Sequence, residues 1–344
     1  MVDLKSLTME EMKAFVLSLG EKPFRAKQIF KWVYRGAEIC DMTDLSKDLR
    51  EKLLKNACVG NIQIEERLIS KDGTRKYLFK LSDGNFIESV FMKYKHGNTI
   101  CVSSQAGCAM GCRFCASTID GFSRNLTPSE IIDQIMKTEE DTGEKISNIV
   151  MMGIGEPLAN FENVIKFLEN VNAEDGLNIG YRHISLSTCG LADKIRDLAD
   201  INIPITLSVS LHSPFNEKRS DLMPVNKKFP IPELISAMRY YLEKTGRRIS
   251  IEYAMIEGEN DTKECANELV RLFSDMLCHV NLIPVNKVKE RDYKKTSADK
   301  IEAFKNKLCR MGLNTTVRRS LGSDINAACG QLRKNRMNNE NLSD

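Results

Sequence analysis

The pattern of apolar and polar positions changes from one stretch of the chain to the next. Within residues 1–60 the apolar side chains have the spacing of amphipathic helices, and the predicted helices cover 9–19, 23–34 and 44–55. Short alternating runs then follow at 62–69, 76–81 and 86–92. The turns Lys-Asp-Gly and Ser-Asp-Gly separate these runs, so this stretch predicts a β-meander.

From about residue 99 onward, strand-like runs alternate with helical ones. The predicted strands lie at 100–103, 148–152, 183–187, 205–210, 250–255, 279–283 and 315–318. The predicted helices lie at 127–140, 161–171, 191–199, 232–244, 261–273 and 297–311. This alternation indicates an α/β fold with a parallel sheet, either doubly wound or curled into a full or partial barrel. In each arrangement the carboxyl ends of the strands carry the functional site.

Composition narrows the class of protein. The chain has 344 residues and is 42% hydrophobic, which suffices for one large domain or for a large and a small one. Its formal net charge is only +3, so a surface for nucleic acid would depend on where the charges lie. The sequence shows no signal peptide, and no stretch approaches the roughly 18 to 20 apolar residues of a membrane span. We therefore expect a cytoplasmic protein without a membrane partner.

Basic side chains gather on and around the predicted helix 23–34. They are Lys22, Arg25, Lys27, Lys31 and Arg35. Such a group suits contact with RNA phosphates, and it suits a solvated helix face equally well. The sequence leaves both interpretations open.

Eleven cysteines are a high count for a chain expected in a reducing compartment, where structural disulfides are disfavoured. Three of them, Cys108, Cys112 and Cys115, form a CxxxCxxC triplet directly after the first predicted strand of the alternating region. Structural zinc usually takes four ligands in two close pairs, and no second pair follows at that spacing. The triplet therefore favours an iron–sulfur cluster with one open iron, and a zinc site completed by a distant Cys or His is the alternative.

Five other cysteines stand singly among apolar residues. They are Cys40, Cys58, Cys265, Cys278 and Cys309. We expect them to be small core side chains, because an isolated cysteine behaves as a small apolar residue.

Glycine and polar residues follow several of the predicted strands. Gly155 and Glu156 stand in a glycine-rich turn, where a ligand can approach the backbone and a carboxylate can accept hydrogen bonds from an ammonium group. Later strand ends supply Ser187, Ser210, Leu211, His212 and Asn286. Because strand ends of this kind share one rim of a sheet, these residues predict a cofactor site. A simple glycine turn and a structural histidine are the alternatives.

The triplet and several longer strings resemble known proteins. A CxxxCxxC loop after the first strand of a βα barrel is similar to the radical S-adenosylmethionine (SAM) superfamily. The strings at 101–108, 153–160 and 327–332 extend the likeness to the RlmN/Cfr family of RNA adenosine methyltransferases. Further matches, among them the strings at 121–127, 219–224 and 279–284, spread this resemblance over about residues 22–332.

The resemblance implies an α/β fold with a partial (βα)6 radical SAM barrel. The barrel, with a catalytic cysteine loop near its C-terminal end, is expected over 99–332, after a β-meander extension over 61–98. Residues 1–60 are expected to form a small helical RNA-binding domain, and residues 333–344 a flexible polar tail.

The resemblance also implies roles for individual residues. Cys108, Cys112 and Cys115 would hold a [4Fe-4S] cluster, and the strand-end residues would bind SAM, of which two molecules are used per turnover. Cys329 would carry the methyl group as S-methylcysteine and would bond covalently to the RNA. Cys101 would resolve that adduct by forming a disulfide bond with Cys329.

Glu88 is the implied base that removes a proton from the substituted carbon. Alternation along the predicted strand places Glu88 on the same face as Phe86 and Val90, where partial desolvation suits a general base. A solvent-facing carboxylate is the alternative. For Cys101 and Cys329 the alternative is an ordinary buried thiol.

Within the family the resemblance favours the RlmN branch, because Pro157 stands where Cfr-like proteins tend to have alanine. It implies methylation of adenine C2 in 23S rRNA, at the peptidyl transferase centre, and in tRNA beside the anticodon. It also implies a monomer and an electron donor such as flavodoxin or ferredoxin. Cys189 departs from the family pattern, since a small residue without a thiol is common there, and this leaves fine substrate preference open.

A base reaches such a site only when it is unstacked from its neighbours. Candidates for steering RNA to the cluster are Arg113, Arg124, Arg318 and Arg319, although the last two also suit ordinary strand-end charges. The alternatives to the whole assignment are methylation of adenine C8, an RNA-binding protein with a structural or redox-sensing cluster, and an activase that makes a glycyl radical on a partner.

Overall fold

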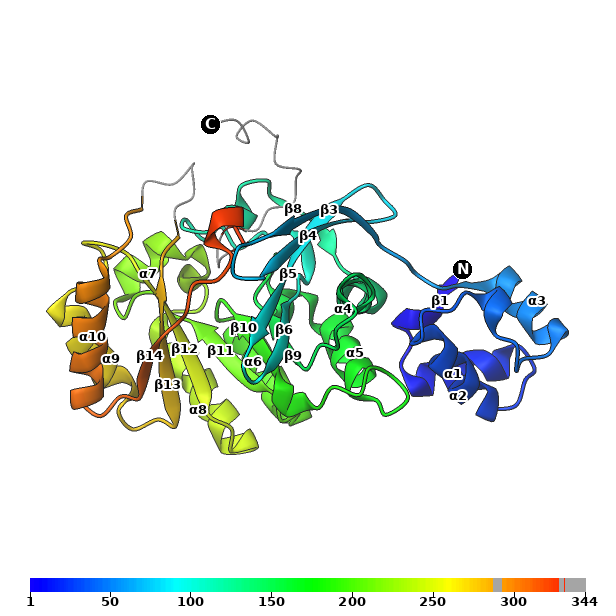
Figure 1. Ribbon diagram of the computed structural model, residues 1–344. Coiled ribbons are helices and arrows are strands. Elements are labelled where there is room, and N and C mark those ends of the chain that lie inside the picture. The colour runs from blue at the N-terminus through cyan, green and yellow to red at the C-terminus, as the bar shows by residue number, and fades with distance from the viewer. Residues whose placement is uncertain (287–292, 328–330, 332–344) are drawn as a thin grey trace.

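The computed structural model describes residues 1–286, 293–327 and 331 of the chain. Its main feature is one mixed sheet with the strand order β14-β13-β12-β11-β10-β9-β6-β5-β4-β3 (Figure 1). In chain order the strands are β3 (Gln63–Ile69), β4 (Arg75–Lys80), β5 (Phe86–Tyr94), β6 (Gly97–Cys101), β9 (Asn148–Met151), β10 (Ile184–Thr188), β11 (Thr206–Ser210), β12 (Ile249–Met255), β13 (Cys278–Pro284) and β14 (Thr315–Val317).

The sheet has a parallel part and an antiparallel part that meet at β6. From β6 to β14 every neighbouring pair is parallel, whereas β3, β4, β5 and β6 pair in antiparallel fashion. Because β14 and β3 lie at opposite edges, the sheet stays open. The predicted α/β fold with a partial barrel is confirmed, and the predicted meander is present as the antiparallel part.

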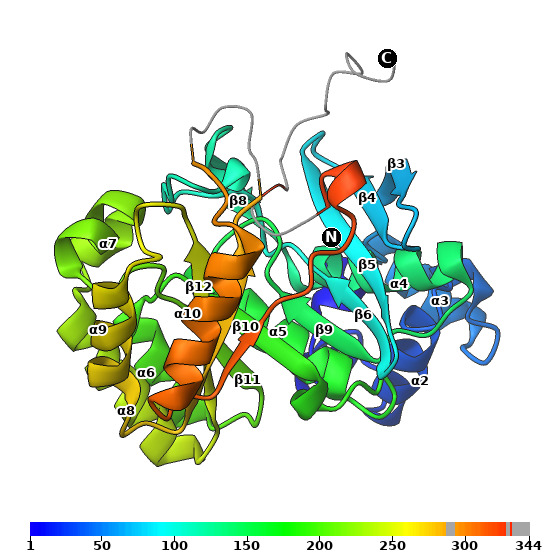
Figure 2. The ribbon, with the colours of Figure 1, turned by 60° about the vertical axis from the view of Figure 1, so that its left-hand side comes forward.

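Helices connect the parallel strands and cover the outside of the curved sheet (Figure 2). They are α4 (Pro128–Thr142), α5 (Phe161–Asn172), α6 (Ala192–Ile201), α8 (Ile231–Thr245), α9 (Lys263–Phe273) and α10 (Ala298–Arg310). Local sequence sets their ends. Thr127 and Glu130 form a capping box at the start of α4, and Gly143, at φ 68°, ends that helix in the left-handed conformation.

Residues near the N-terminus form a separate module at one end of the molecule, drawn in blue in Figure 1. Its helices are α1 (Met9–Ser18), α2 (Phe24–Val33) and α3 (Lys47–Asn56). Strand β1 (Val2–Asp3) pairs in parallel with β2 (Ala57–Cys58), so the two ends of the module are joined. The sequence predicted the helices but not this short pairing, because two-residue strands show no alternation.

Two further elements lie beside the barrel rim and were not predicted. Strands β7 (Gln105–Gly107) and β8 (Phe122–Asn125) form a hairpin that encloses the cysteine loop, and α7 (Asn216–Leu222) follows β11. The triplet therefore follows β7 rather than β6. At Gly107 an added Cβ would lie 1.8 Å from the carbonyl oxygen of Gly121, so the hairpin needs glycine there.

The single cysteines divide into two groups. Cys265 and Cys278 are buried, as expected of small core residues, and Cys58 is half-buried. The expectation is wrong for Cys40 and Cys309, which are exposed. In α10 the neighbouring Leu308 takes the buried position, and the next residue consequently faces away from the core.

A buried ion pair fastens the N-terminal module to α4. The ammonium group of Lys5 contacts the carboxylate of Asp133, and the two side chains are 4% and 1% exposed. Lys5 Nζ also donates to the carbonyl oxygen of Gly60 at 2.6 Å. No helix among the described residues has the length and apolar character to cross a membrane.

The substitution Lys5→Met should destabilise the protein by about 3–5 kcal/mol, because it leaves Asp133 buried without its counter-charge. The free energy of unfolding in urea measures this change. The matched control Lys13→Met removes an exposed ion pair with Glu10 and should change it by less than about 0.5 kcal/mol.

The destabilisation caused by Lys5→Met should depend on pH. Burial raises the pKa of Asp133 to about 6, although Lys5 opposes the rise, whereas an unfolded aspartate titrates near 4. Between these values the folded chain binds more protons than the unfolded one, so this group's contribution to stability falls as pH rises. Lys5→Met should therefore destabilise less at pH 5 than at pH 8, and an equal loss at both pH values would contradict the assignment.

Candidate active site

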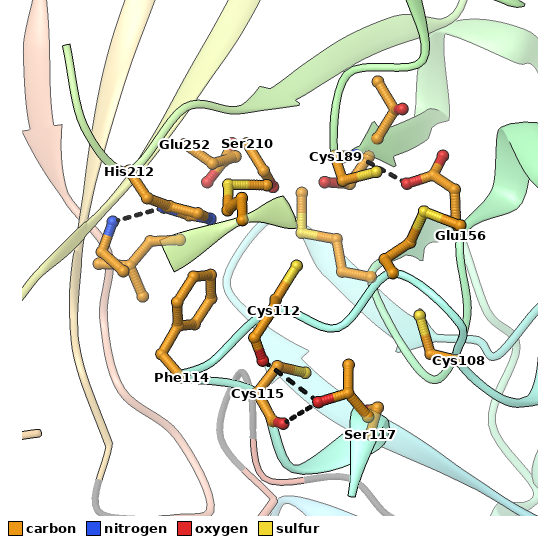
Figure 3. A pocket seen from close by; sticks show the side chains of 18 of the residues that line it. Cys108, Cys112, Phe114, Cys115, Ser117, Glu156, Cys189, Ser210, His212 and Glu252 are labelled. Atoms are coloured by element: carbon orange, nitrogen blue, oxygen red, sulfur yellow. Dashed lines mark hydrogen bonds between the residues drawn. The ribbon is translucent and has the colours of Figure 1, made fainter. Parts of the chain in front are cut away.

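A cavity of about 990 Å³, counting its open mouth, lies at the carboxyl ends of the parallel strands. The cysteine loop forms one wall and the strand ends form the other (Figure 3). The predicted residues that line it are Cys108, Cys112, Cys115, Gly155, Glu156, Ser187, Ser210, His212 and Asn286. Leu211 does not line the cavity, because its side chain is buried in the core and 1% exposed. Tertiary structure thus brings residues from five separate loops to one space.

The three cysteines of the triplet share this cavity. Burial raises the pKa of the Cys108 thiol to about 12, and it raises the pKa of Cys112 as well. Burial therefore disfavours the thiolate form of both side chains. Among the described residues, no three Cys, His, Asp or Glu side chains are grouped closely enough to hold a single metal ion. A cluster of several irons, each bound by one thiolate, fits three spread cysteines better than a lone ion does.

Glu156 joins the ends of β9 and β10. Its carboxylate accepts hydrogen bonds from the backbone N–H of Cys189 at 2.7 Å and from that of Leu158 at 3.0 Å. Burial raises its pKa, while these hydrogen bonds oppose the rise. The side chains of Cys189 and Thr188 also hydrogen-bond to this carboxylate, so a ligand would share its acceptor positions with them.

The two glycines of the turn before Glu156 have a structural reason. An added Cβ at Gly153 would lie 2.6 Å from the carbonyl oxygen of Val102, and at Gly155, where φ is 104°, it would lie 2.5 Å from Cβ of Gln105. The backbone after β6 thus passes directly beside this turn. Glycine is needed there for packing, whether or not a ligand also approaches the backbone.

His212 is neutral and fixed in place. Its backbone is left-handed, with φ 55°, and Nδ1 accepts a hydrogen bond from the backbone N–H of Ala254 at 2.9 Å. Burial lowers its pKa to about 3, and the nearby Arg219 lowers it further. In the neutral ring the proton is therefore on Nε2, which leaves that nitrogen as a donor. The ring edge meets Phe114, with ring centroids 4.6 Å apart.

Arg219 is fully buried and hydrogen-bonds to the ends of several strands. Its guanidinium donates to the carbonyl oxygens of Cys189 at 2.7 Å, Ser210 at 3.1 Å and Leu211 at 3.2 Å, and to Oδ1 of Asn226 at 2.7 Å. Burial lowers its pKa to about 10, a value at which it stays charged near neutral pH. Sequence reasoning gave Arg219 no role of its own, because an arginine side chain normally faces solvent.

Several lining residues were not predicted. They include Phe114, Ser117, Thr118, Met152, Thr188 and Glu252. Glu252 is 3% exposed and accepts hydrogen bonds from Ser250 Oγ and Asn281 Nδ2, both at 2.8 Å. The sequence did carry a signal for Glu252, because an acidic residue is unusual within a strand whose other residues are apolar.

A second cavity of about 510 Å³ contains the thiol of Cys101. It shares Met152, Ile283, Asn286 and Arg318 with the first cavity, so the two are adjacent. Ala327 also lines it. Cys329 lies outside the described residues.

Glu88 lines neither cavity. It lies on β5, is 3% exposed, and has its Oε1 2.8 Å from Nζ of Lys76 on β4. The expected desolvation of Glu88 is present, and the buried lysine beside it was not foreseen.

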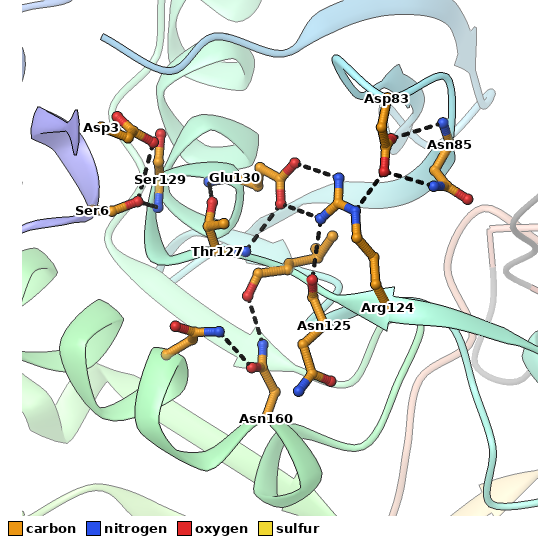
Figure 4. A network of polar contacts seen from close by, with 12 residues as sticks. Asp3, Ser6, Asp83, Asn85, Arg124, Asn125, Thr127, Ser129, Glu130 and Asn160 are labelled. Carbon is orange, nitrogen blue, oxygen red and sulfur yellow. Dashed lines mark hydrogen bonds and ion pairs between the residues drawn. The ribbon is translucent and has the colours of Figure 1, made fainter. Parts of the chain in front are cut away.

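The candidate RNA-steering arginines differ in their surroundings. Arg124 pairs with both Asp83 and Glu130, and it contacts Glu130 through two nitrogens at 2.8 Å each (Figure 4). It therefore braces the hairpin against α4, and its charge is compensated by these two carboxylates. Arg318 lines both cavities, whereas Arg113 and Arg319 are exposed.

Comparisons with known proteins agree with this geometry. Two family models match the sequence, the ribosomal RNA large subunit methyltransferase N-terminal domain over residues 2–59 and the radical SAM superfamily over residues 102–271. A protein of Alkaliphilus oremlandii named probable dual-specificity RNA methyltransferase RlmN is 58% identical over 98% of this chain and 99% of its own length. A protein of the same name from Clostridioides difficile is 53% identical over 96% and 97%.

A solved structure shows the same architecture. The crystal structure of a radical SAM methyltransferase from Sphaerobacter thermophilus matches with a TM-score of 0.91 and 41% sequence identity, over 96% of this chain and 99% of that one. Both the helical module and the barrel fall within the matched length. The chain therefore belongs to the RlmN family of radical SAM RNA methyltransferases.

Proposed function

We propose that the protein methylates C2 of adenosine in 23S rRNA, at the peptidyl transferase centre, and in tRNA beside the anticodon. The observation that carries this proposal is the adjacency of the two cavities. A thiol outside the triplet, Cys101, lines a cavity that shares four residues with the cavity of the triplet and the strand ends. The name of the relatives, dual-specificity RNA methyltransferase, supports two kinds of RNA substrate.

The family implies a [4Fe-4S] cluster and SAM. Cys108, Cys112 and Cys115 would hold the cluster, which when bound supplies the electron that cleaves SAM to a 5′-deoxyadenosyl radical. Glu156 would accept hydrogen bonds from the ammonium group of SAM. The other polar groups of the strand ends, Ser187, Ser210, His212 and Asn286, would orient its remaining polar atoms, with Gly155 beside them.

The chain's own thiols would carry the methyl group. Adenine C2 is electron-poor and does not attack the methyl group of SAM as a ring nitrogen would. Cys329 would therefore take a methyl group from one SAM as a thioether. The 5′-deoxyadenosyl radical from a second SAM would take a hydrogen atom from that S-methyl group, and the resulting carbon radical would add to C2, so that two SAM molecules are used per turnover. The adduct would then lose one electron, which would return to the cluster, and the C2 proton, which Glu88 would remove. Cys101 would attack the sulfur of Cys329 to form a disulfide, and the released carbon would take up a proton to give the methylated base.

We further propose that the N-terminal module, residues 1–60, contacts RNA. Lys22 and Arg35 are exposed, whereas Lys27 and Lys31 each lie 3.2 Å from a carboxylate oxygen of Asp175. These two lysines are thus partly compensated within the chain. We infer a cytoplasmic monomer that draws electrons from a flavodoxin or ferredoxin.

The product nucleoside tests the proposed position of methylation. The protein, with its cluster rebuilt without oxygen, is incubated with unmodified rRNA and tRNA, SAM and a reductant. Digestion and mass spectrometry should detect 2-methyladenosine in both RNAs. Detection of 8-methyladenosine in its place would overturn the C2 assignment, and a product in only one RNA would overturn dual specificity.

Single cysteine variants test the proposed carriers. Cys329→Ala should lose S-methylcysteine and product together, because the methyl group has no acceptor. Cys101→Ala should retain S-methylation and accumulate a covalent protein–RNA adduct, which is visible as a shifted band that nuclease removes. Cys309→Ala, which changes an exposed thiol, is the control and should behave as the unaltered protein does. Product formation by Cys329→Ala would contradict the proposed role of Cys329 as the methyl carrier.

A further inference from the structure

The turn between β3 and β4 holds a segment near the C-terminal end of the chain, residues 322–327. Ser70 Oγ donates to Oδ1 of Asp324 at 2.6 Å, and the backbone N–H of Lys71 donates to Oδ2 of Asp324 at 3.3 Å. In return, the backbone N–H of Gly322 donates to Oδ2 of Asp72 at 2.9 Å. Two stretches about 250 residues apart thus exchange hydrogen bonds in both directions.

The segment 322–327 has a defined shape against this turn. Gly322 is left-handed at φ 62°, and an added Cβ would lie 2.8 Å from Cβ of Ala327 and 2.9 Å from Cγ2 of Thr74. The backbone N–H of Ala327 donates to the carbonyl oxygen of Gly322 at 2.9 Å, so the segment folds back on itself. Asn326 is left-handed as well, at φ 51°. Such close packing and strained backbone indicate a specific docked conformation.

Lys76 connects this segment to the proposed base. Its Nζ lies 2.8 Å from Oε1 of Glu88 and 3.3 Å from the carbonyl oxygen of Asn326, and its side chain is 3% exposed. A buried ammonium group loses much of its hydration and needs acceptors within the protein. Its position is therefore set by β5 and by the segment 322–327 together.

We propose that Lys76 is a positioning residue that fixes the carboxylate of Glu88 according to whether the segment 322–327 is docked. This inference rests on the proposed function, since Glu88 is there the base and Cys329 the methyl carrier. Asn326 precedes Cys329 by three residues in the sequence. When the segment leaves its place, Lys76 loses an acceptor and shifts, and Glu88 loses its fixed partner. Proton removal is thereby tied to the docked state of the chain that leads to the methyl carrier.

A purely structural role for Lys76, that of neutralising a buried carboxylate, makes a different prediction. In that case its loss would lower the amount of folded protein, and methylation of Cys329, adduct formation and adduct resolution would all fall by the same factor. Positioning instead affects only the step that uses Glu88, and it alters the dynamics of residues 322–327.

The test compares Lys76→Met with Lys80→Met, which changes an exposed lysine on the same strand. Full-length protein with its cluster rebuilt is assayed for S-methylcysteine at position 329, for covalent RNA adduct and for released methylated nucleoside. Hydrogen exchange of the amides of residues 322–327 is measured in parallel, without SAM or RNA. Lys80→Met should match the unaltered protein in every measurement.

Lys76→Met should keep S-methylation and adduct formation while resolution of the adduct slows by about 10²-fold, the loss typical of a misplaced catalytic group. Exchange of the amides of residues 322–327 should become faster. Lys76→Arg, which keeps a cation and hydrogen-bond donors, should recover part of the resolution rate. If Lys76→Met resolves adducts at the normal rate, or if its exchange is unchanged, the inference is wrong.

A second variant keeps the proposal testable if Lys76→Met does not fold. Asp324→Asn alters an exposed carboxylate and weakens the contacts with Ser70 and Lys71 without touching Glu88. It should also speed exchange of the segment and slow adduct resolution, and an unchanged resolution rate despite faster exchange would overturn the coupling. If the unaltered protein forms neither adduct nor methylated nucleoside, the proposed function itself is wrong. Even then, faster hydrogen exchange of residues 322–327 in Lys76→Met would confirm the contact between Lys76 and Asn326.

Discussion

The parallel pairing of β6 with β9 is the constraint on which the site depends. It joins the antiparallel extension, which carries Lys76 and Glu88, to the barrel that carries the triplet cavity. The register sets Ile100 opposite Ile149 and Cys101 opposite Val150. Because successive side chains of a strand face opposite sides, a shift of one residue would turn Cys101 away from its cavity. This single register therefore decides whether the thiol of Cys101 lies beside the carboxyl ends of the parallel strands.

Buried polar groups at the rim are held mainly by the backbone. Glu156 accepts from two backbone N–H groups, and Arg219 donates to three backbone carbonyl oxygens. Such contacts keep charges in place without a paired opposite charge that would occupy the cavity. Burial then favours the neutral form of Glu156 and His212 and raises the pKa of the Cys108 and Cys112 thiols.

The antiparallel extension, β3 to β5, provides residues that the proposed chemistry uses. Its first turn holds residues 322–327, its middle strand provides Lys76, and its third strand provides Glu88. Two contacts with a distant part of the chain, made by Ser70 and Lys76, and the ion pair of Lys76 with Glu88 are thus concentrated on one antiparallel sheet. An antiparallel edge of this kind can be added to a parallel sheet without changing the strand order of the barrel.

The sequence by itself determined the fold class, the order of helices and strands, the triplet and most of the strand-end residues. These depend on periodicity and spacing, which are local and can be read along the chain. Only the tertiary structure decided that Lys76 pairs with Glu88, that Arg219 is buried, that Arg124 is held by Asp83 and Glu130, and that Leu211 faces the core. Each of these outcomes depends on a partner from another part of the chain or on the direction in which a side chain points, and neither is encoded in local spacing.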